Sequence, residues 1–185
     1  MSARVSINGR VMLPEQAQIS IFDRGFLYGD SIYETLRVYE KHPFRLYDHL
    51  IRLEQSGVWV GFVLPWSYEH IARIAEETRA ASEYDNAYMR IIVTRGTGEM
   101  GLDPGLARDP ALIVIVMPLP EYPPKLYSEG RTAWCVPLSR GHLNDISPLA
   151  KTGNYLKSVL AMQQASKHRA HEAIMLNDKG NVAES

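Results

Sequence analysis

The chain contains 185 residues, of which 45% are hydrophobic and 22% are charged, and its net charge is -1 at pH 7. This composition excludes a disordered chain, and the balanced charge does not favour nucleic acid or an anionic membrane as a partner. Cys135 is the single cysteine, which rules out a disulfide within the chain and favours a cytoplasmic location. The longest apolar run, residues 111–117, is too short to cross a membrane.

Residues 1–118 are expected to form an N-terminal α+β domain. Asn8-Gly9 lies between short apolar segments, a pattern typical of a β-hairpin. The segment 22–30 carries glycines at 25 and 29 and indicates a tightly shaped loop. The remaining patterns predict strands at 32–39, 87–94 and 112–116, a helix from Leu46, and a second helix capped by Ser67.

A change of composition near residues 119–124 predicts an interdomain linker. Residues 125–185 are then expected to begin a second domain, with strands at 132–136 and 173–176 and a helix ending near His168. A further strand starts at Val182, and the chain stops at Ser185. Two strands and one helix are too little to close a core, so this domain is expected to be incomplete.

Lys151 lies at the centre of the most informative stretch of the chain. Turn-forming residues precede it, and an apolar helical pattern begins at Leu156. A lysine that loses its proton near neutral pH attacks a carbonyl and forms a Schiff base. The alternative is an ordinary solvated lysine, which is the usual state of this residue. The rest of the chain decides between the two interpretations.

Other patterns are weaker. The segment 96–101 reads G-x-G-x-x-G, but a turn and not a helix follows it, so the dinucleotide-binding fingerprint fails. Arg90 and Arg95 begin on opposite faces of one strand, and either suits a carboxylate or a surface ion pair. His49 and Arg52 share a helix face. Arg52 suits a phosphate, and His49 equally suits a structural role. No residues have metal-ligand spacing, and no metal is expected.

The order of four segments resembles the class IV aminotransferases, which have fold type IV and use pyridoxal 5′-phosphate. The segments are residues 22–37, 48–53, 151–156 and 172–185. The resemblance is collinear over nearly the whole chain. It implies a two-domain α+β fold, and a homodimer or higher homo-oligomer whose active site lies near the subunit interface.

The resemblance also implies roles for individual residues. Lys151 matches the lysine that binds the cofactor covalently and moves the proton. Glu184 matches the acid that pairs with the pyridine nitrogen, where a carboxylate keeps the ring able to absorb carbanion charge. Arg52 matches the arginine of the cofactor phosphate. Tyr155 matches the tyrosine near the phenolic oxygen, although the segment between Lys151 and Tyr155 is one residue shorter than in branched-chain enzymes.

The substrate side resembles the branched-chain amino acid enzymes of the family, with departures. Tyr33 stands where those enzymes usually have phenylalanine, and Thr35 where they usually have glycine. Arg95 resembles a carboxylate-binding arginine of D-amino acid aminotransferases. The residues expected to face the substrate are Tyr28, Tyr33, Arg37, Tyr88, Arg90 and Arg95.

The sequence therefore predicts a transaminase that moves an amino group between a branched-chain or other apolar amino acid and a 2-oxo acid. Stereochemistry stays open. The alternatives are an aminodeoxychorismate lyase that releases pyruvate and 4-aminobenzoate, and an inactive truncated form.

Overall fold

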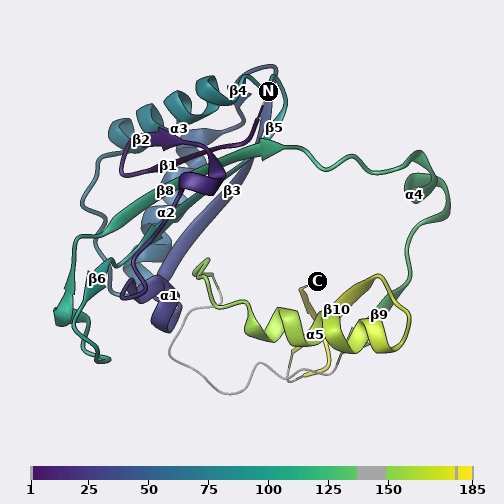
Figure 1. The fold of residues 1–185 in the computed structure, drawn as a ribbon. Coiled ribbons are helices and arrows are strands. Elements are labelled where there is room, and N and C mark those ends of the chain that lie inside the picture. Colours follow the sequence, from purple (N-terminus) through teal and green to yellow (C-terminus); the bar gives the residue numbers. More distant parts are fainter. Residues whose placement is uncertain (1, 137–148, 178, 185) are drawn as a thin grey trace. The chain divides into compact units, whose positions relative to one another are not determined.

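The structure is a computed structural model that describes residues 2–136, 149–177 and 179–184. The described chain divides into two units, which are drawn in Figure 1. Residues 2–119 and 149–153 form the first unit, and residues 120–136 and 154–184 form the second, apart from Asp178. The α+β class expected from the sequence is confirmed. Among the described residues, no helix is both long and apolar enough to cross a membrane.

The first unit is built on an antiparallel sheet whose strand order is β2-β1-β8-β5-β3-β4. Its strands are β1 (Arg4–Ile7), β2 (Arg10–Met12), β3 (Ser31–Tyr39), β4 (His42–Pro43), β5 (Ala87–Thr94) and β8 (Ala111–Pro118). A separate short pair joins β6 (Thr97–Gly98) to β7 (Ala107–Arg108). The unit also contains α1 (Arg24–Tyr28), α2 (Leu46–Trp59), α3 (Tyr68–Ser82) and the 3-10 turns Pro14–Gln16 and Pro104–Leu106.

The core of this unit lies between one face of the sheet and the helices α2 and α3. Alternate residues of β3 and β5, such as Leu36 and Ile91, pack with Leu50, Leu53 and Ile71 of the two helices. Because successive side chains of a strand point to opposite faces, the residues between them lie on the face away from the helices. This alternation separates two groups of site residues.

Several expected elements are confirmed in detail. Asn8 and Gly9 form the turn between β1 and β2, and both have positive φ. The Ser67 hydroxyl accepts a hydrogen bond from the backbone N–H of His70 and caps α3. The expected loop at 22–30 is different, because residues 24–28 form the short helix α1. Asp23 caps this helix by accepting from the N–H of Gly25.

The second unit contains a three-stranded sheet in the order β11-β10-β9. Its strands are β9 (Ala133–Val136), β10 (Glu172–Leu176) and β11 (Val182–Glu184), and its helices are α4 (Pro124–Glu129) and α5 (Leu156–Lys167). Strands β9 and β10 are parallel, and β10 and β11 are antiparallel. A small core of Val136, Ala161, Ala165, Ala173 and Met175 joins α5 to this sheet.

The Lys151 segment belongs with the first unit, whereas the sequence analysis places it in the second domain. The physical reason is its backbone hydrogen bonds, which go to β3 and α2. The linker at 119–124 stays a prediction, and its last residue, Pro124, is the first residue of α4.

Candidate active site

Lys151 is held by its backbone at the edge of β3. Its carbonyl accepts a hydrogen bond from the N–H of Tyr33 at 3.0 Å, and its own N–H donates to the Ser56 hydroxyl on α2 at 3.2 Å. Gly153 donates to the carbonyl of Ser31 at 3.0 Å. The backbone of the lysine is therefore fixed to two elements of the first unit.

The Lys151 ammonium lies over the ring of Tyr33, with Nζ 4.7 Å from the ring centroid. The same ring is stacked by Arg90, whose guanidinium carbon is 4.2 Å from the centroid. Tyr33 is buried, and Lys151 and Arg90 are half-buried. Aromatic rings attract cations at these distances, so Tyr33 organises both positive side chains on the face of the sheet away from the helices.

Strand pairing brings further predicted substrate residues to this face. Thr35 pairs with Arg90, and Arg37 pairs with Tyr88 across β3 and β5. The hydroxyl groups of Thr35 and Tyr88 are 3.3 Å apart. The structure thus gathers Tyr33, Arg37, Tyr88 and Arg90 on one face beside Lys151.

Arg52 lies against Glu34, the strand residue that follows Tyr33 and points to the helix side. Nε and Nη2 of Arg52 donate to the two carboxylate oxygens of Glu34 at 2.5 and 2.6 Å. His49 Nδ1 is 2.9 Å from Glu34 Oε2. The Glu34 side chain is 0% exposed and that of Arg52 is 50% exposed. This cluster therefore joins a fully buried carboxylate to a half-exposed guanidinium.

Burial alone would raise the pKa of Glu34, since it disfavours the charged form. Hydrogen bonds from Arg52 and His49, together with their charges, outweigh burial and lower the pKa of Glu34 below its usual range. The hydrogen bond to Glu34 in turn raises the pKa of Arg52. Glu34 is thus an ionised carboxylate at neutral pH.

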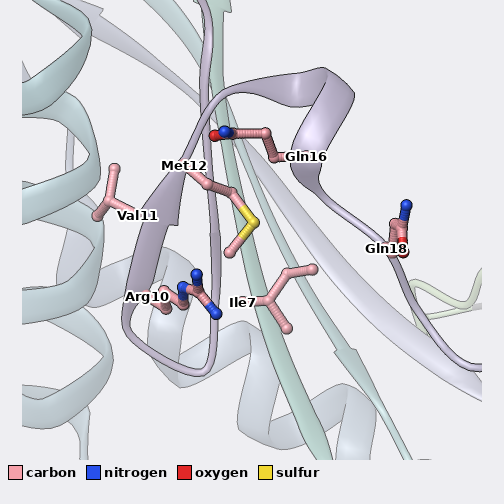
Figure 2. Close-up of a pocket in the computed structure, with 6 residues that line it drawn as sticks. All are labelled: Ile7, Arg10, Val11, Met12, Gln16 and Gln18. Carbon is pink, nitrogen blue, oxygen red and sulfur yellow. The ribbon is translucent and has the colours of Figure 1, made fainter.

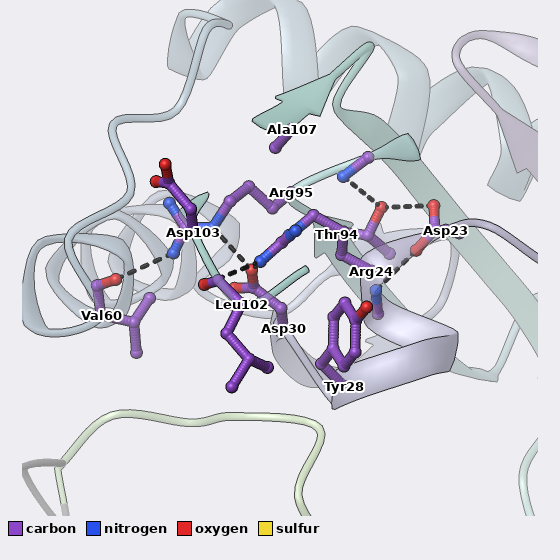
Figure 3. A network of polar contacts seen from close by, with 12 residues as sticks. Asp23, Arg24, Tyr28, Asp30, Val60, Thr94, Arg95, Leu102, Asp103 and Ala107 are labelled. Atoms are coloured by element: carbon purple, nitrogen blue, oxygen red, sulfur yellow. Dashed lines mark hydrogen bonds and ion pairs between the residues drawn. The ribbon is translucent and has the colours of Figure 1, made fainter. Parts of the chain in front are cut away.

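Tyr28 and Arg95 lie in a second polar network, shown in Figure 3, around Asp30. Asp30 Oδ2 accepts from Nε of Arg95 at 2.7 Å and from Nε of Arg24 at 3.2 Å. Arg95 also donates to the carbonyls of Gly61 and Val60. The Tyr28 hydroxyl accepts from the N–H of Gly101. The network ties α1 to the loops that follow α2 and β5.

Tyr155 and Glu184 lie in the second unit. Tyr155 is the N-terminal cap residue of α5, and its carbonyl accepts the N–H of Val159. Glu184 is the last residue of β11 and pairs with Met175 of β10. Both side chains are exposed.

A surface pocket lies elsewhere in the first unit, on the β1–β2 hairpin and the turn after it (Figure 2). Its lining residues are Ile7, Arg10, Val11, Met12, Gln16 and Gln18. It includes none of the residues predicted for the site. Among the described residues, no cluster of histidine, cysteine, aspartate or glutamate has the arrangement of a metal site.

Comparison with known families agrees with this geometry. A family model described as amino-transferase class IV matches residues 31–185. The chain belongs to the class IV aminotransferases.

Relatives of this class IV aminotransferase chain include branched-chain enzymes. It is 36% identical over 181 residues to a putative branched-chain-amino-acid aminotransferase of Methanocaldococcus jannaschii, covering 98% of this chain and 62% of the relative. It matches the structure of Escherichia coli branched-chain amino acid aminotransferase with a TM-score of 0.89 and 26% identity, over 100% of this chain and 62% of the other.

A third similar structure carries a cofactor. A branched-chain amino acid aminotransferase from T.th., solved with pyridoxamine 5′-phosphate, matches with a TM-score of 0.87 and 26% identity, again over 100% of this chain and 62% of the other. The present chain therefore spans less than two thirds of the length of these relatives.

In this class IV aminotransferase, sequence reasoning missed two residues of the Lys151 site. Ser56 accepts from the Lys151 backbone, and only the folded arrangement of α2 beside β3 reveals this. Glu34 had a detectable signal, because it shares the period-2 face of β3 with Ile32 and Leu36. A charged residue in the middle of an apolar face is rarely buried without a partner, and the nearby His49 and Arg52 are such partners.

Proposed function

We propose that the protein is a pyridoxal 5′-phosphate-dependent transaminase, with a branched-chain or other apolar amino acid and a 2-oxo acid as its substrates. The observation that carries the proposal is the position of Lys151 and Arg52 on either side of consecutive residues of β3. Lys151 lies over Tyr33, and Arg52 is paired with Glu34. A nucleophilic amine and a phosphate-binding cation are the two groups that a pyridoxal phosphate site requires first.

The donors of Arg52 fit the cofactor phosphate. Glu34 occupies Nε and one N–H of Nη2, and within the described part of the chain Nη1 makes no hydrogen bond. The guanidinium therefore keeps N–H groups for an anion, and its half exposure allows access. Ser56 lies one turn after Arg52 and binds the Lys151 backbone, so α2 sets the spacing between the two groups.

The bound pyridoxal ring supplies an electron sink for the charge that develops at the substrate Cα. In this mechanism Lys151 Nζ removes the proton from Cα and returns it to the adjacent cofactor carbon. Glu184 holds a proton on the pyridine nitrogen, and Tyr155 orients the ring through its phenolic oxygen. The Tyr33, Arg37, Tyr88 and Arg90 face orients the substrate.

The assembly and location are proposed on the same basis. A homodimer follows from the family resemblance. A cytoplasmic location is supported by the single cysteine, which requires no oxidising compartment.

The first test is the visible absorption spectrum of the full-length protein with added pyridoxal 5′-phosphate, followed by borohydride and peptide mapping. The expected result is a cofactor band that borohydride fixes on the peptide containing Lys151. Lys151→Ala is expected to abolish the label, and Lys157→Ala is the matched control because it removes an exposed lysine of α5. A label on another lysine, or a band unchanged in Lys151→Ala, would refute the role of Lys151.

Product analysis then tests the reaction. The transaminase requires a 2-oxo acid as amino acceptor, and a screen of apolar L- and D-amino acids identifies the donor. Release of pyruvate from aminodeoxychorismate without an acceptor would favour the lyase and contradict the transaminase.

A further inference from the structure

Glu34 is a charged residue in the middle of the core face of β3. Its neighbours on that face, Ile32 and Leu36, belong to the apolar core with α2. The Glu34 side chain has no exposed surface. An ionised carboxylate in such a place is costly unless its oxygen atoms are fully hydrogen-bonded, so the contacts of Glu34 explain why it is tolerated.

Both oxygens of Glu34 are occupied. Oε1 accepts from Arg52 Nε, and Oε2 accepts from Arg52 Nη2 and from His49 Nδ1. The N–H of Thr35 is also 3.3 Å from Oε2. Because an ionised carboxylate only accepts hydrogen bonds, His49 must carry its proton on Nδ1. The 3.3 Å approach between His49 Nδ1 and Arg52 Nη2 then joins two donors and is not a hydrogen bond.

This geometry fixes the orientation of the Arg52 guanidinium. The group is planar, so two parallel hydrogen bonds from Nε and Nη2 leave it no rotation about the Cδ–Nε bond. Both N–H groups of Nη1 and the second N–H of Nη2 are left on the sides that do not face Glu34. His49 bounds the guanidinium at Nη2, which directs the remaining donors away from the core.

We propose that Glu34 is a positioning residue for the cofactor phosphate, which acts by holding Arg52 in one orientation from inside the core. The proposal rests on the proposed function. It assigns a role to a residue that touches neither the cofactor nor the substrate, and it makes the buried face of β3 part of the phosphate site.

Two effects of Glu34 on anion binding oppose each other. Its negative charge lowers the net charge of the cluster and weakens attraction for a phosphate. Its fork with Arg52 removes the conformational freedom that the arginine would otherwise lose on binding. Positioning is the larger effect here, because three side-chain hydrogen bonds at 2.5–2.9 Å hold the cluster and the carboxylate is remote from solvent.

The test measures the affinity of the full-length apoprotein for pyridoxal 5′-phosphate and for pyridoxal, which lacks the phosphate. Glu34→Gln keeps the shape of the side chain and removes its charge. It is expected to weaken pyridoxal 5′-phosphate binding about tenfold, as loss of an orienting partner typically does, and to leave pyridoxal binding unchanged. Equal or tighter binding of pyridoxal 5′-phosphate by Glu34→Gln would overturn the proposal, since charge would then dominate.

Further variants separate positioning from folding. Glu34→Asp keeps the charge but is one methylene too short for the fork, and it is expected to weaken pyridoxal 5′-phosphate binding as well. In an Arg52→Ala background, Glu34→Gln is expected to cause no further loss. An equal loss of affinity for both ligands would indicate a structural role only and would contradict the proposal.

The matched control is Glu77→Gln on α3, which breaks an exposed arginine–glutamate pair with Arg73. It is expected to bind both ligands as the wild type does. The proposed function fails separately, if the wild-type protein binds pyridoxal 5′-phosphate no tighter than pyridoxal. The positioning role fails if the wild type discriminates and the Glu34 variants discriminate equally well.

Discussion

Two arginine–carboxylate clusters flank the first half of β3, and they differ in what their arginines have left to bind. Around Asp30, the side chains of Arg24 and Arg95 are 3% and 11% exposed. Their donors reach Asp30 and the backbone carbonyls of Val60, Gly61, Gly101 and Leu102. Around Glu34, Arg52 is half exposed, and Nη1 makes no hydrogen bond within the described residues.

The difference teaches how to distinguish an arginine that ties loops together from one that receives a ligand. An arginine whose donors are satisfied by the protein is part of the scaffold, and binding a ligand would require it to break those bonds. The substrate role predicted for Arg95 from the sequence therefore carries a cost that the phosphate role of Arg52 does not.

The Asp30 cluster is expected to matter most for stability. Asp30→Ala leaves two largely buried guanidinium groups without their carboxylate. Removing one partner of a buried pair is strongly destabilising, and a loss of about 3 kcal/mol in the free energy of unfolding is expected. Urea denaturation measures it. A loss below about 1 kcal/mol, the size of a surface pair, would contradict the scaffold role.

The Glu34 cluster is expected to matter most for cofactor affinity. Arg52→Ala removes charge-assisted hydrogen bonds to the phosphate and is expected to weaken pyridoxal 5′-phosphate binding roughly 10- to 100-fold. Fluorescence titration of the apoprotein measures this. Arg73→Ala on α3 is the control, since that arginine only pairs with Glu77, and comparable losses in both variants would refute the site.

Acid is expected to affect the Glu34 cluster through the lowered pKa of the carboxyl group. A lowered folded-state pKa gives stability that is present above the ordinary value of about 4.3 and is lost as the pH falls through the folded value. The difference in unfolding free energy between wild type and Glu34→Gln is therefore expected to shrink as the pH falls below about 4. Thermal unfolding across this range measures it, and a constant difference would exclude Glu34 as an ionised group.

The smallest effect is expected at the Lys151 segment. A Cβ at Gly153 would contact the hydroxyl oxygen of Ser31, which can rotate away, so Gly153→Ala is expected to cost about 1 kcal/mol. Thermal unfolding measures the loss. Adding Ser31→Ala removes the contact and is expected to restore most of the stability. No recovery in the double variant would place the strain elsewhere.

The sequence predicted the elements that depend on local patterns. The strand at 87–94 has the predicted bounds, and the helix from Leu46 and the cap at Ser67 follow from periodicity and side-chain chemistry. Helix α1 was missed because its Asp23 cap is held by Thr94, which is 71 residues away in sequence. Contacts of that kind are absent from any local pattern.

The candidate site was predictable to a similar extent. Lys151, Arg52 and the residues of the Tyr33 face follow from the resemblance and from strand alternation. The docking of Lys151 against Tyr33 and Ser56 was not predictable, because it depends on a loop distant in sequence from both. The scaffold role of Arg95 also needed the structure, since its partners lie on separate segments.

The hydrogen bonds of the Lys151 segment have a consequence for the solubility of the first unit. Strand β3 has an outer edge that β4 covers only at Val38 and Tyr39. The Lys151 segment covers the other end of this edge, with an antiparallel bridge between Ile32 and Thr152. Uncovered strand edges pair with other chains and promote aggregation. The segment that carries the reactive lysine therefore also guards the sheet against edge-to-edge association.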